Sequence, residues 1–296
     1  MRYFNIILVI LFASPLLSCE DVVPVDITPS AAQLAVDGDI TTSVQPDTVR
    51  LMMTVPYLDN SRNIPFVNDA LVVIEEKESS LSDTLRSIGD GNYITTKLRG
   101  KINRNYILTI EYQGEKYTAE TTIKRVARID SVLTDYREES EFGRKPGYYI
   151  DLLANDLPGI GDCYRLKVYR NGILYNRPND LNLAYDASFS KGGSTDGTRF
   201  IFPIRESLNP SSTTNEDNPP FELNDKVRVE ITSLTEDHFE FYRSLRDELN
   251  NGGLFATPPA NLKTNIKNVN RSSEKQAVGW FGGSAISSME ITITKP

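Results

Sequence analysis

Short stretches in which apolar and polar residues alternate recur along the first half of the chain. In the segment 106–112, Leu108 and Ile110 fall on one face and Thr109 on the other, because successive side chains of a strand point to opposite faces. Similar segments bounded by turn residues predict strands at 33–40, 49–55, 70–76, 82–88, 92–96 and 116–123. Together they predict an immunoglobulin-like or transthyretin-like β-sandwich over residues 33–126.

The second half of the chain also alternates, but it contains one long helical period. Strands are predicted at 148–154, 163–169, 173–175, 198–204, 226–232, 277–283 and 288–294, with polar loops at 176–198 and 207–220. After Thr235, a good N-cap residue, Phe239, Tyr242 and Leu245 recur at helical spacing and predict an amphipathic helix over 236–251. The pattern therefore predicts a mostly β protein with two β-sandwich domains, the second a β-rich region over 127–296 that carries this helix.

The N-terminus has a different pattern. Arg2 precedes an apolar run from Ile6 to Leu17 that is too short to span a bilayer comfortably, and the sequence Leu-Leu-Ser-Cys follows at 16–19. This arrangement resembles a bacterial lipoprotein signal with its lipobox. The resemblance implies that residues 1–18 are a signal peptide and that Cys19 becomes a lipidated N-terminus, which would tether the chain to a membrane. The proline-containing residues 19–32 are predicted to form an extended, lipidated tether.

Two acidic residues, Glu20 and Asp21, follow this cysteine directly. They resemble the export tag that sends Bacteroidetes lipoproteins to the outside of the outer membrane, although a polar start to a linker would look the same. We expect a lipid-anchored protein of the outer membrane that faces the cell exterior. No second apolar run of membrane-spanning length exists in the sequence, so the lipid is the expected membrane contact.

Composition narrows the chemistry. The formal net charge is −8, which argues against a nucleic-acid partner because phosphate binding requires a basic face. The chain has two cysteines; with Cys19 lipidated, Cys163 has no partner for a disulfide, and its place in the strand pattern puts it on the polar side or at a strand end. The one histidine, His238, has no predicted nucleophile or metal ligands beside it and is assigned a structural role.

Two features remain as candidates for binding. Asp156 and Asp162 flank a Gly-containing loop that can offer oxygens to Ca²⁺, and Asp186 and Asp196 bracket another loop, but neither has the regular spacing of a calcium loop, and Asp and Gly also build ordinary turns. We therefore predict no metal, no cofactor and no catalytic residue. Several aromatic residues can form a stacking platform for a glycan or peptide ligand or can pack a core instead: Tyr148, Tyr149, Tyr175, Tyr185 and Trp280.

The order of these features along the chain resembles a known family. A lipobox, a sandwich opening at Leu34–Ile40, the helix near 235–251, the segment 255–262 and a late Gly279-Trp280-Phe281 occur in that order. This resembles a family of Bacteroidetes lipoproteins known as domain of unknown function 4249. The resemblance implies a cell-surface lipoprotein that is often encoded beside a TonB-dependent receptor, and it offers no established catalytic residues to carry over.

The expected function is therefore non-catalytic. We expect an accessory or ligand-capture subunit of a TonB-dependent transport system, with the receptor as its protein partner and contacts made by the long loops at 176–198 and 207–220. The first alternative is a surface adhesin or structural spacer that uses the N-terminal sandwich as a stalk. The second is a hydrolase that uses a pair of carboxylates assembled in space.

Overall fold

The computed structural model describes residues 31–56, 63–140, 144–188, 195–201, 204–205, 207–210, 219–252, 257–258 and 260–295. The predicted signal peptide and Cys19 lie outside these residues, as do most of the predicted tether and part of the predicted 207–220 loop. Residues Ala32–Pro296 form one compact unit. No helix in the described part of the chain is both long enough and apolar enough to cross a membrane.

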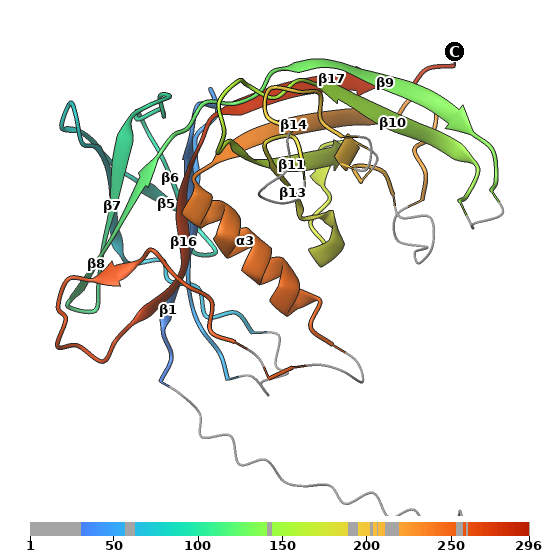
Figure 1. The fold of residues 1–296 in the computed structure, drawn as a ribbon. Helices are drawn as coiled ribbons and strands as arrows, with labels where there is room; N and C mark the ends of the chain where they lie inside the picture. The colour runs from blue at the N-terminus through green and yellow to red at the C-terminus, as the bar shows by residue number, and fades with distance from the viewer. Residues whose placement is uncertain are drawn as a thin grey trace, which may run out of the picture. The chain divides into compact units, whose positions relative to one another are not determined.

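The first region consists of two five-stranded sheets that share one core (Figure 1). One sheet has the strand order β16-β1-β2-β6-β5 and the other β15-β8-β7-β3-β4. Large side chains from both sheets, such as Ile40 and Tyr106, are fully buried between them. The strands are β1 (Leu34–Thr41), β2 (Thr48–Met53), β3 (Leu71–Glu76), β4 (Leu81–Thr84), β5 (Arg86–Gly89), β6 (Asn92–Ile94), β7 (Asn105–Tyr112), β8 (Glu115–Thr122), β15 (Lys267–Asn268) and β16 (Ala277–Ser284). The prediction of a mostly β fold is confirmed.

The strand predicted at 82–88 is wrong as a single element. It is two strands, because the chain passes from one sheet to the other at Leu85: β4 pairs with β3, and β5 pairs with β6. The Leu85 side chain is buried in the core, and its N–H donates to the carbonyl oxygen of Val72 at 2.9 Å. The sequence could not show this crossing, because the segment 82–88 has only two apolar residues, Leu85 and Ile88, and no glycine or proline between them.

Two strands of this region come from the far end of the sequence. β16 pairs in parallel with β1, from Leu34 opposite Ala277 to Thr41 opposite Ser284, and β15 pairs with β8. The division of the chain at residue 126 therefore does not separate the two regions, since the first region also contains residues 267–268 and 277–284.

The second region is built on a five-stranded sheet in which β14 lies between β11 and β17, and β12 and β13 both pair with β11. A separate antiparallel pair joins β9 to β10. Side chains from both, including Ile150, Tyr164 and Ile231, share a second core. The strands are β9 (Ile129–Arg137), β10 (Gly147–Ala154), β11 (Cys163–Arg170), β12 (Ile173–Leu174), β13 (Asn182–Tyr185), β14 (Lys226–Leu234) and β17 (Ile286–Thr292).

Two predictions for this region are wrong. The predicted loop 176–198 contains a short 3-10 helix, η2 (Pro178–Asp180), as well as β13. The predicted strand 198–204 makes only one bridge in its described part, between Asn155 and Arg199. The Phe200 N–H donates to the carbonyl oxygen of Ala154 at the end of β10, and the Asp156 N–H donates to that of Thr198. The apolar run therefore pairs only briefly at the end of β10 while its side chains pack the core.

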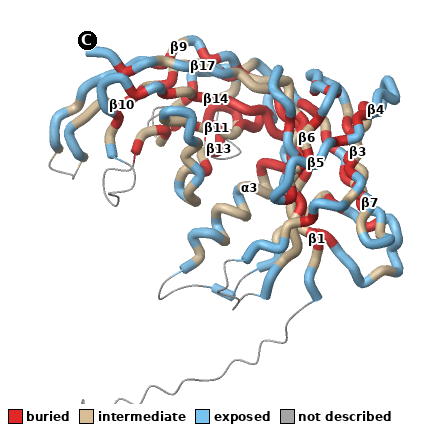
Figure 2. Tube along the Cα trace, turned by 180° about the vertical axis from the view of Figure 1, so that it is seen from behind, coloured by how far each residue is buried: buried red, intermediate tan, exposed pale blue. Residues whose placement is uncertain are grey.

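The long helix, α3 (Glu236–Leu249), begins where the sequence predicts and ends two residues earlier than predicted. The Thr235 hydroxyl accepts a hydrogen bond from the backbone N–H of His238 at 3.3 Å, and the acidic residues Glu236 and Asp237 occupy the positive first turn. The helix contacts β11, β13, β14, β16 and η2. Figure 2 shows buried residues on β11 and β14, at the beginning of α3 and among the strands of the first region, whereas the last residues of the helix are partly or fully exposed.

Candidate functional site

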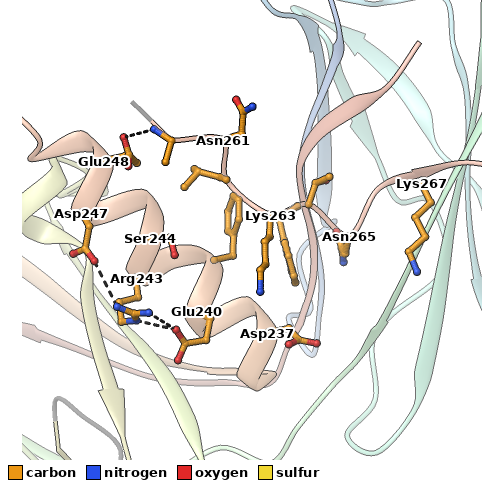
Figure 3. A pocket seen from close by; sticks show the side chains of 15 residues that line it. Asp237, Glu240, Arg243, Ser244, Asp247, Glu248, Asn261, Lys263, Asn265 and Lys267 are labelled. Carbon is orange, nitrogen blue, oxygen red and sulfur yellow. Dashed lines mark hydrogen bonds and ion pairs between the residues drawn. The ribbon is translucent and has the colours of Figure 1, made fainter. Parts of the chain in front are cut away.

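A large cavity forms a groove between α3 and the segment 260–267 (Figure 3). Its volume is about 860 Å³, which lies within the range of small-molecule sites. Acidic side chains come from the helix, and lysines come from the facing segment. We call it the α3 groove; it is lined by Asp237, Glu240, Phe241, Arg243, Ser244, Asp247, Glu248, Ala260, Asn261, Leu262, Lys263, Thr264, Asn265, Lys267 and Trp280.

Aromatic rings form the floor of this groove. The rings of Phe241 and His238 lie 5.0 and 5.6 Å from that of Trp280, and both are stacked on it. The two rings lie only 6.4 Å from each other, so they stack on the same side of the indole. No other aromatic ring of the described residues contacts Trp280, which leaves its second face without an aromatic partner.

Charged side chains on the rim differ in their pairing. Arg243 pairs with Glu240 at 2.7 Å and with Asp247 at 3.6 Å, so these three groups largely neutralise one another. Within the described part of the chain, Asp237 and Lys263 make neither an ion pair nor a side-chain hydrogen bond, and both are exposed. Figure 3 shows Asp237 on α3 and Lys263 on the facing segment. They are the groups that a bound molecule can reach.

His238 belongs to the structure beneath the groove. It is 2% exposed, and its ring stacks on Tyr242 at 4.5 Å as well as on Trp280. Burial, together with the nearby charges of Arg165 and Lys167, lowers the pKa of His238 to about 3, so the imidazole is neutral at physiological pH. This environment agrees with the structural role predicted from the sequence.

A layer of charged groups lies beside this histidine. The guanidinium carbon of Arg165 lies 4.7 Å from the centre of the Tyr242 ring, a cation–π contact. Burial and the neighbouring Arg165 lower the pKa of Lys167, although Asp39 and Glu230 oppose the shift. Burial also raises the pKa of the Tyr242 hydroxyl, with a further contribution from Asp39.

The glycines of β16 make this arrangement sterically feasible. At Gly279 the backbone φ is +93°, and a Cβ atom there would lie 2.0 Å from the carbonyl oxygen of Val36. At Gly282 a Cβ atom would lie 2.0 Å from Asp39 Oδ1 and 2.2 Å from His238 Cε1. Only glycine lets β1 and α3 approach β16 so closely. The Gly-rich sequence around Trp280 was the available signal, and reasoning from the sequence missed its cause.

The predicted aromatic platform does not form as one surface. Tyr148 and Tyr175 both approach Phe221: Tyr175 stacks on its ring at 6.2 Å, and Tyr148 forms a backbone bridge with it. Tyr148 lines a cavity of about 550 Å³ together with Tyr136, whereas Tyr175 lines another of about 350 Å³. The structure therefore groups these two tyrosines around Phe221.

The other two tyrosines serve the packing. Tyr149 is buried, and its hydroxyl donates to the Lys145 carbonyl oxygen at 2.7 Å. Tyr185 packs against Phe239 of α3, in a small hydrophobic cluster that also contains Leu183 and Leu234. Of the five predicted aromatic residues, Trp280 is the one that lines the α3 groove.

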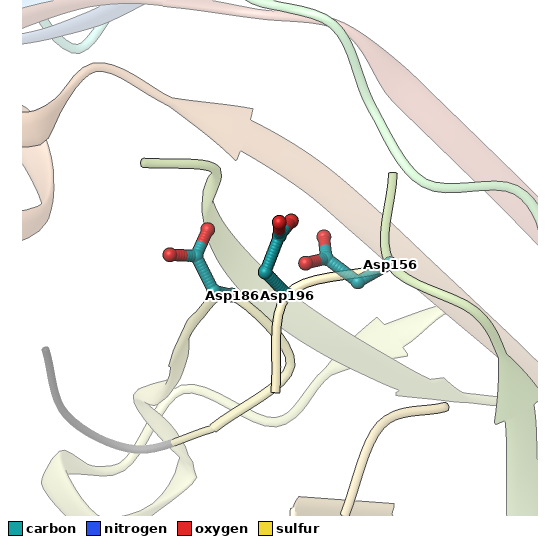
Figure 4. Close-up of side chains that lie close together, drawn as sticks. All are labelled: Asp156, Asp186 and Asp196. Carbon is teal, nitrogen blue, oxygen red and sulfur yellow. The ribbon is translucent and has the colours of Figure 1, made fainter. Parts of the chain in front are cut away.

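The acidic loops that were considered for Ca²⁺ converge in part (Figure 4). Asp156, Asp186 and Asp196 each place a carboxylate oxygen within 4.8 Å of the others, a spacing that can hold a divalent cation. Each also accepts hydrogen bonds: Asp156 from the Tyr164 hydroxyl at 2.7 Å, and Asp196 from the Gly159 N–H at 2.9 Å. Burial raises the pKa of Asp156 despite these bonds. None of the four cavities described here is lined by these carboxylates.

Asp162, the second predicted calcium candidate, does not belong to this group. Its carboxylate pairs with Arg125 through two hydrogen bonds, at 3.0 Å from Nε and 2.5 Å from Nη2. The neighbouring Cys163 begins β11, as the strand pattern allows, and is 2% exposed in a cluster with Leu183 and Leu234.

The fold and the groove define a class of protein: a β-rich chain with one long helix that borders an aromatic-floored cavity. Residues 20–290 match the family model described as Domain of unknown function (DUF4249), and the chain belongs to that family. The resemblance predicted from the sequence is thereby confirmed. No curated protein matches the chain.

Proposed function

We propose that this chain is a lipid-anchored protein of the outer-membrane surface that captures a glycan or a peptide for a TonB-dependent receptor. The observation that carries the ligand-capture part is the α3 groove, with the aromatic floor at Trp280 and unpaired charges at Asp237 and Lys263. Flat rings bind sugar faces and peptide side chains, and reachable polar groups orient them. The lipobox at 16–19 supports the anchor.

The anchor is tested first, because it decides where the protein works. In cells grown with an alkyne-labelled fatty acid, the full chain is expected to carry the label and to fractionate with outer membranes. Cys19→Ser is expected to lose both, whereas Cys163→Ser, the matched control at the other cysteine, is expected to keep both. Label on the Cys19→Ser chain would contradict lipidation at this residue.

The partner is tested by purification of the tagged full chain from mildly solubilised outer membranes, followed by mass spectrometry. A stoichiometric TonB-dependent receptor is the expected companion. A solitary lipoprotein would exclude a stable complex and would favour the adhesin or spacer.

Ligand capture is tested on a glycan array and a defined peptide library. Trp280→Ala is expected to abolish binding, and Asp237→Asn with Lys263→Ala to weaken it at least tenfold. The two rim positions are exposed and unpaired, so these substitutions should leave the melting temperature unchanged. Lys226→Ala, at an exposed lysine that does not line the groove, is the control. Equal binding by the rim variant and the control would contradict this use of the groove.

A further inference from the structure

A second cavity borders α3 on the face next to the groove. It has a volume of about 310 Å³ and is enclosed by β1, β11, η2, α3 and β16. Phe241 and Trp280 line both cavities. We call it the α3 recess; it is lined by Val36, Asp37, Arg165, Asn176, Arg177, Pro178, Leu181, Phe241, Tyr242, Leu245, Leu249, Gly279 and Trp280.

Most of the recess wall is apolar, but two opposite charges face it from different strands. Asp37 is on β1, and Arg165 is on β11. The third charged group, Arg177, is already neutralised, because Asp180 accepts hydrogen bonds from its Nε at 2.9 Å and its Nη2 at 3.0 Å. Asp37 and Arg165 have no such partner: in the described part of the chain neither belongs to an ion pair within 4.0 Å.

Buried polar atoms without a hydrogen-bond partner gather around the same place. Arg165 Nε and Trp280 Nε1 belong to residues that line the recess, whereas Asp39 Oδ1 and His238 Nδ1 lie near Gly282 of β16. Each buried polar atom left unpaired costs about 1–3 kcal/mol, so a native structure pairs nearly all of them. Two such atoms on residues that line one cavity, together with the unpaired charges of Asp37 and Arg165, indicate a place that is completed by a polar molecule.

We propose that the α3 recess binds a small zwitterion with an apolar body, of the class of free amino acids and dipeptides. The ligand's ammonium group faces Asp37, and its carboxylate faces Arg165, whose planar guanidinium matches a carboxylate with two parallel hydrogen bonds. The apolar side chain lies against the aromatic and leucine wall. The volume is at the low end for small-molecule sites, which excludes an oligosaccharide or a folded partner.

This inference is independent of the anchor and of the receptor in the proposed function. Its residues are also separable from the groove's polar rim, since Asp37 and Arg165 line the recess alone, whereas Asp237 and Lys263 line the groove alone. If the protein binds amino acids but captures neither a glycan nor a peptide, only the proposed function is overturned. If it captures a glycan or a peptide but binds no amino acid, only the assignment of the recess is overturned.

The single tryptophan of the chain provides the assay. Trp280 is the only tryptophan in the sequence and lines both the recess and the groove, so its fluorescence reports a ligand in either cavity, and the substitutions at Asp37 and Arg165 assign the change to the recess. The full chain, purified in mild detergent, is titrated with L-leucine, L-phenylalanine and L-leucyl-L-leucine. N-acetyl-L-leucine lacks the ammonium group and L-leucinamide lacks the carboxylate; each is titrated in parallel. We expect saturable fluorescence changes with at least one of the three zwitterions and at least tenfold weaker binding of both blocked compounds.

Two substitutions test the residues. Asp37→Asn and Arg165→Gln are each expected to weaken binding of the zwitterion at least tenfold, and Asp37→Asn should weaken leucinamide binding in the same way while leaving N-acetyl-leucine unaffected. Glu111→Gln, an exposed carboxylate outside the recess, is the control. Because Asp37 is exposed, Asp37→Asn should have the melting temperature of the wild-type protein. The proposal can therefore be tested with this variant even if Arg165→Gln unfolds. Absence of any saturable change, or equal binding of the blocked compounds, would overturn the proposal.

Discussion

Replacement of Gly282 by alanine is the sharpest test of how α3 is seated. The added Cβ would lie 2.0 Å from Asp39 Oδ1, 2.2 Å from His238 Cε1 and 2.6 Å from His238 Nδ1. The Asp39 carboxylate can rotate away, but the His238 ring cannot, because it is stacked between Tyr242 and Trp280. Relief of the clash therefore requires α3 to move away from β16.

The cost of that movement can be estimated from its parts. Overpacking of a filled interior costs about 1–3 kcal/mol, and each disturbed aromatic pair adds about 0.5–1.5 kcal/mol. We expect Gly282→Ala to lower the free energy of unfolding by about 2–4 kcal/mol, which corresponds to a melting temperature roughly 4–12 °C lower for a chain of this size.

The assay combines thermal melts, urea midpoints and fluorescence of the single tryptophan, which the displaced ring contacts. The matched control is Gly252→Ala, because a Cβ there has no atom within 4 Å and no left-handed backbone; it should melt within about 2 °C of wild type. If Gly282→Ala has the melting temperature and the emission spectrum of the wild-type protein, the close packing of the His238 ring against Gly282 of β16 is refuted.

Three further predictions concern charge and capping. Burial raises the pKa of Asp47 to about 6, so the folded state binds a proton between about pH 4 and pH 6 that the unfolded chain has lost, and the wild-type protein loses stability as the pH rises through that window. In urea titrations, the stability of Asp47→Asn relative to wild type should increase by on the order of 3 kcal/mol between pH 4 and pH 7. A difference in stability that does not depend on pH would contradict the raised pKa. In EDTA, Asp196→Asn is expected to raise the melting temperature by about 1–3 °C because it relieves repulsion from Asp156 and Asp186; a lower melting temperature would count against net repulsion. Thr235→Ala should cost about 1 kcal/mol through loss of the N-cap, whereas Thr235→Ser should cost little; equal losses would argue against the cap.

The sequence predicted most elements of the fold because local pattern decides them. The hairpin of β7 and β8 alternates without interruption, and α3 has both an N-cap and an apolar stripe. Where tertiary context decides, prediction failed. The change of sheet at Leu85 has no glycine or proline to mark it. β13 lies in a polar, Gly-containing stretch, and it joins the sheet because β11 offers it a free edge.

The candidate site was predictable only in outline. Trp280 stood out because glycines flank it, and it does line the groove. The recess could not be foreseen, because Asp37 and Arg165 lie far apart in sequence and meet only through the packing of β1 and β11 around α3. The convergence of Asp156, Asp186 and Asp196 has the same origin, since loops carry no spacing rule that fixes their meeting in space.

The parallel pairing of β1 with β16 also sets an order of events. The first strand of the folded body gains this neighbour only when residues 277–284 are available, so the sheet cannot be completed while the chain is still emerging. Such distant pairing slows folding and leaves one edge of β1 open in any fragment that stops before residue 277, where it can pair with other chains. Fragments that end near residue 126 are therefore poor substitutes for the intact protein, because they lack the strand that completes the first sheet.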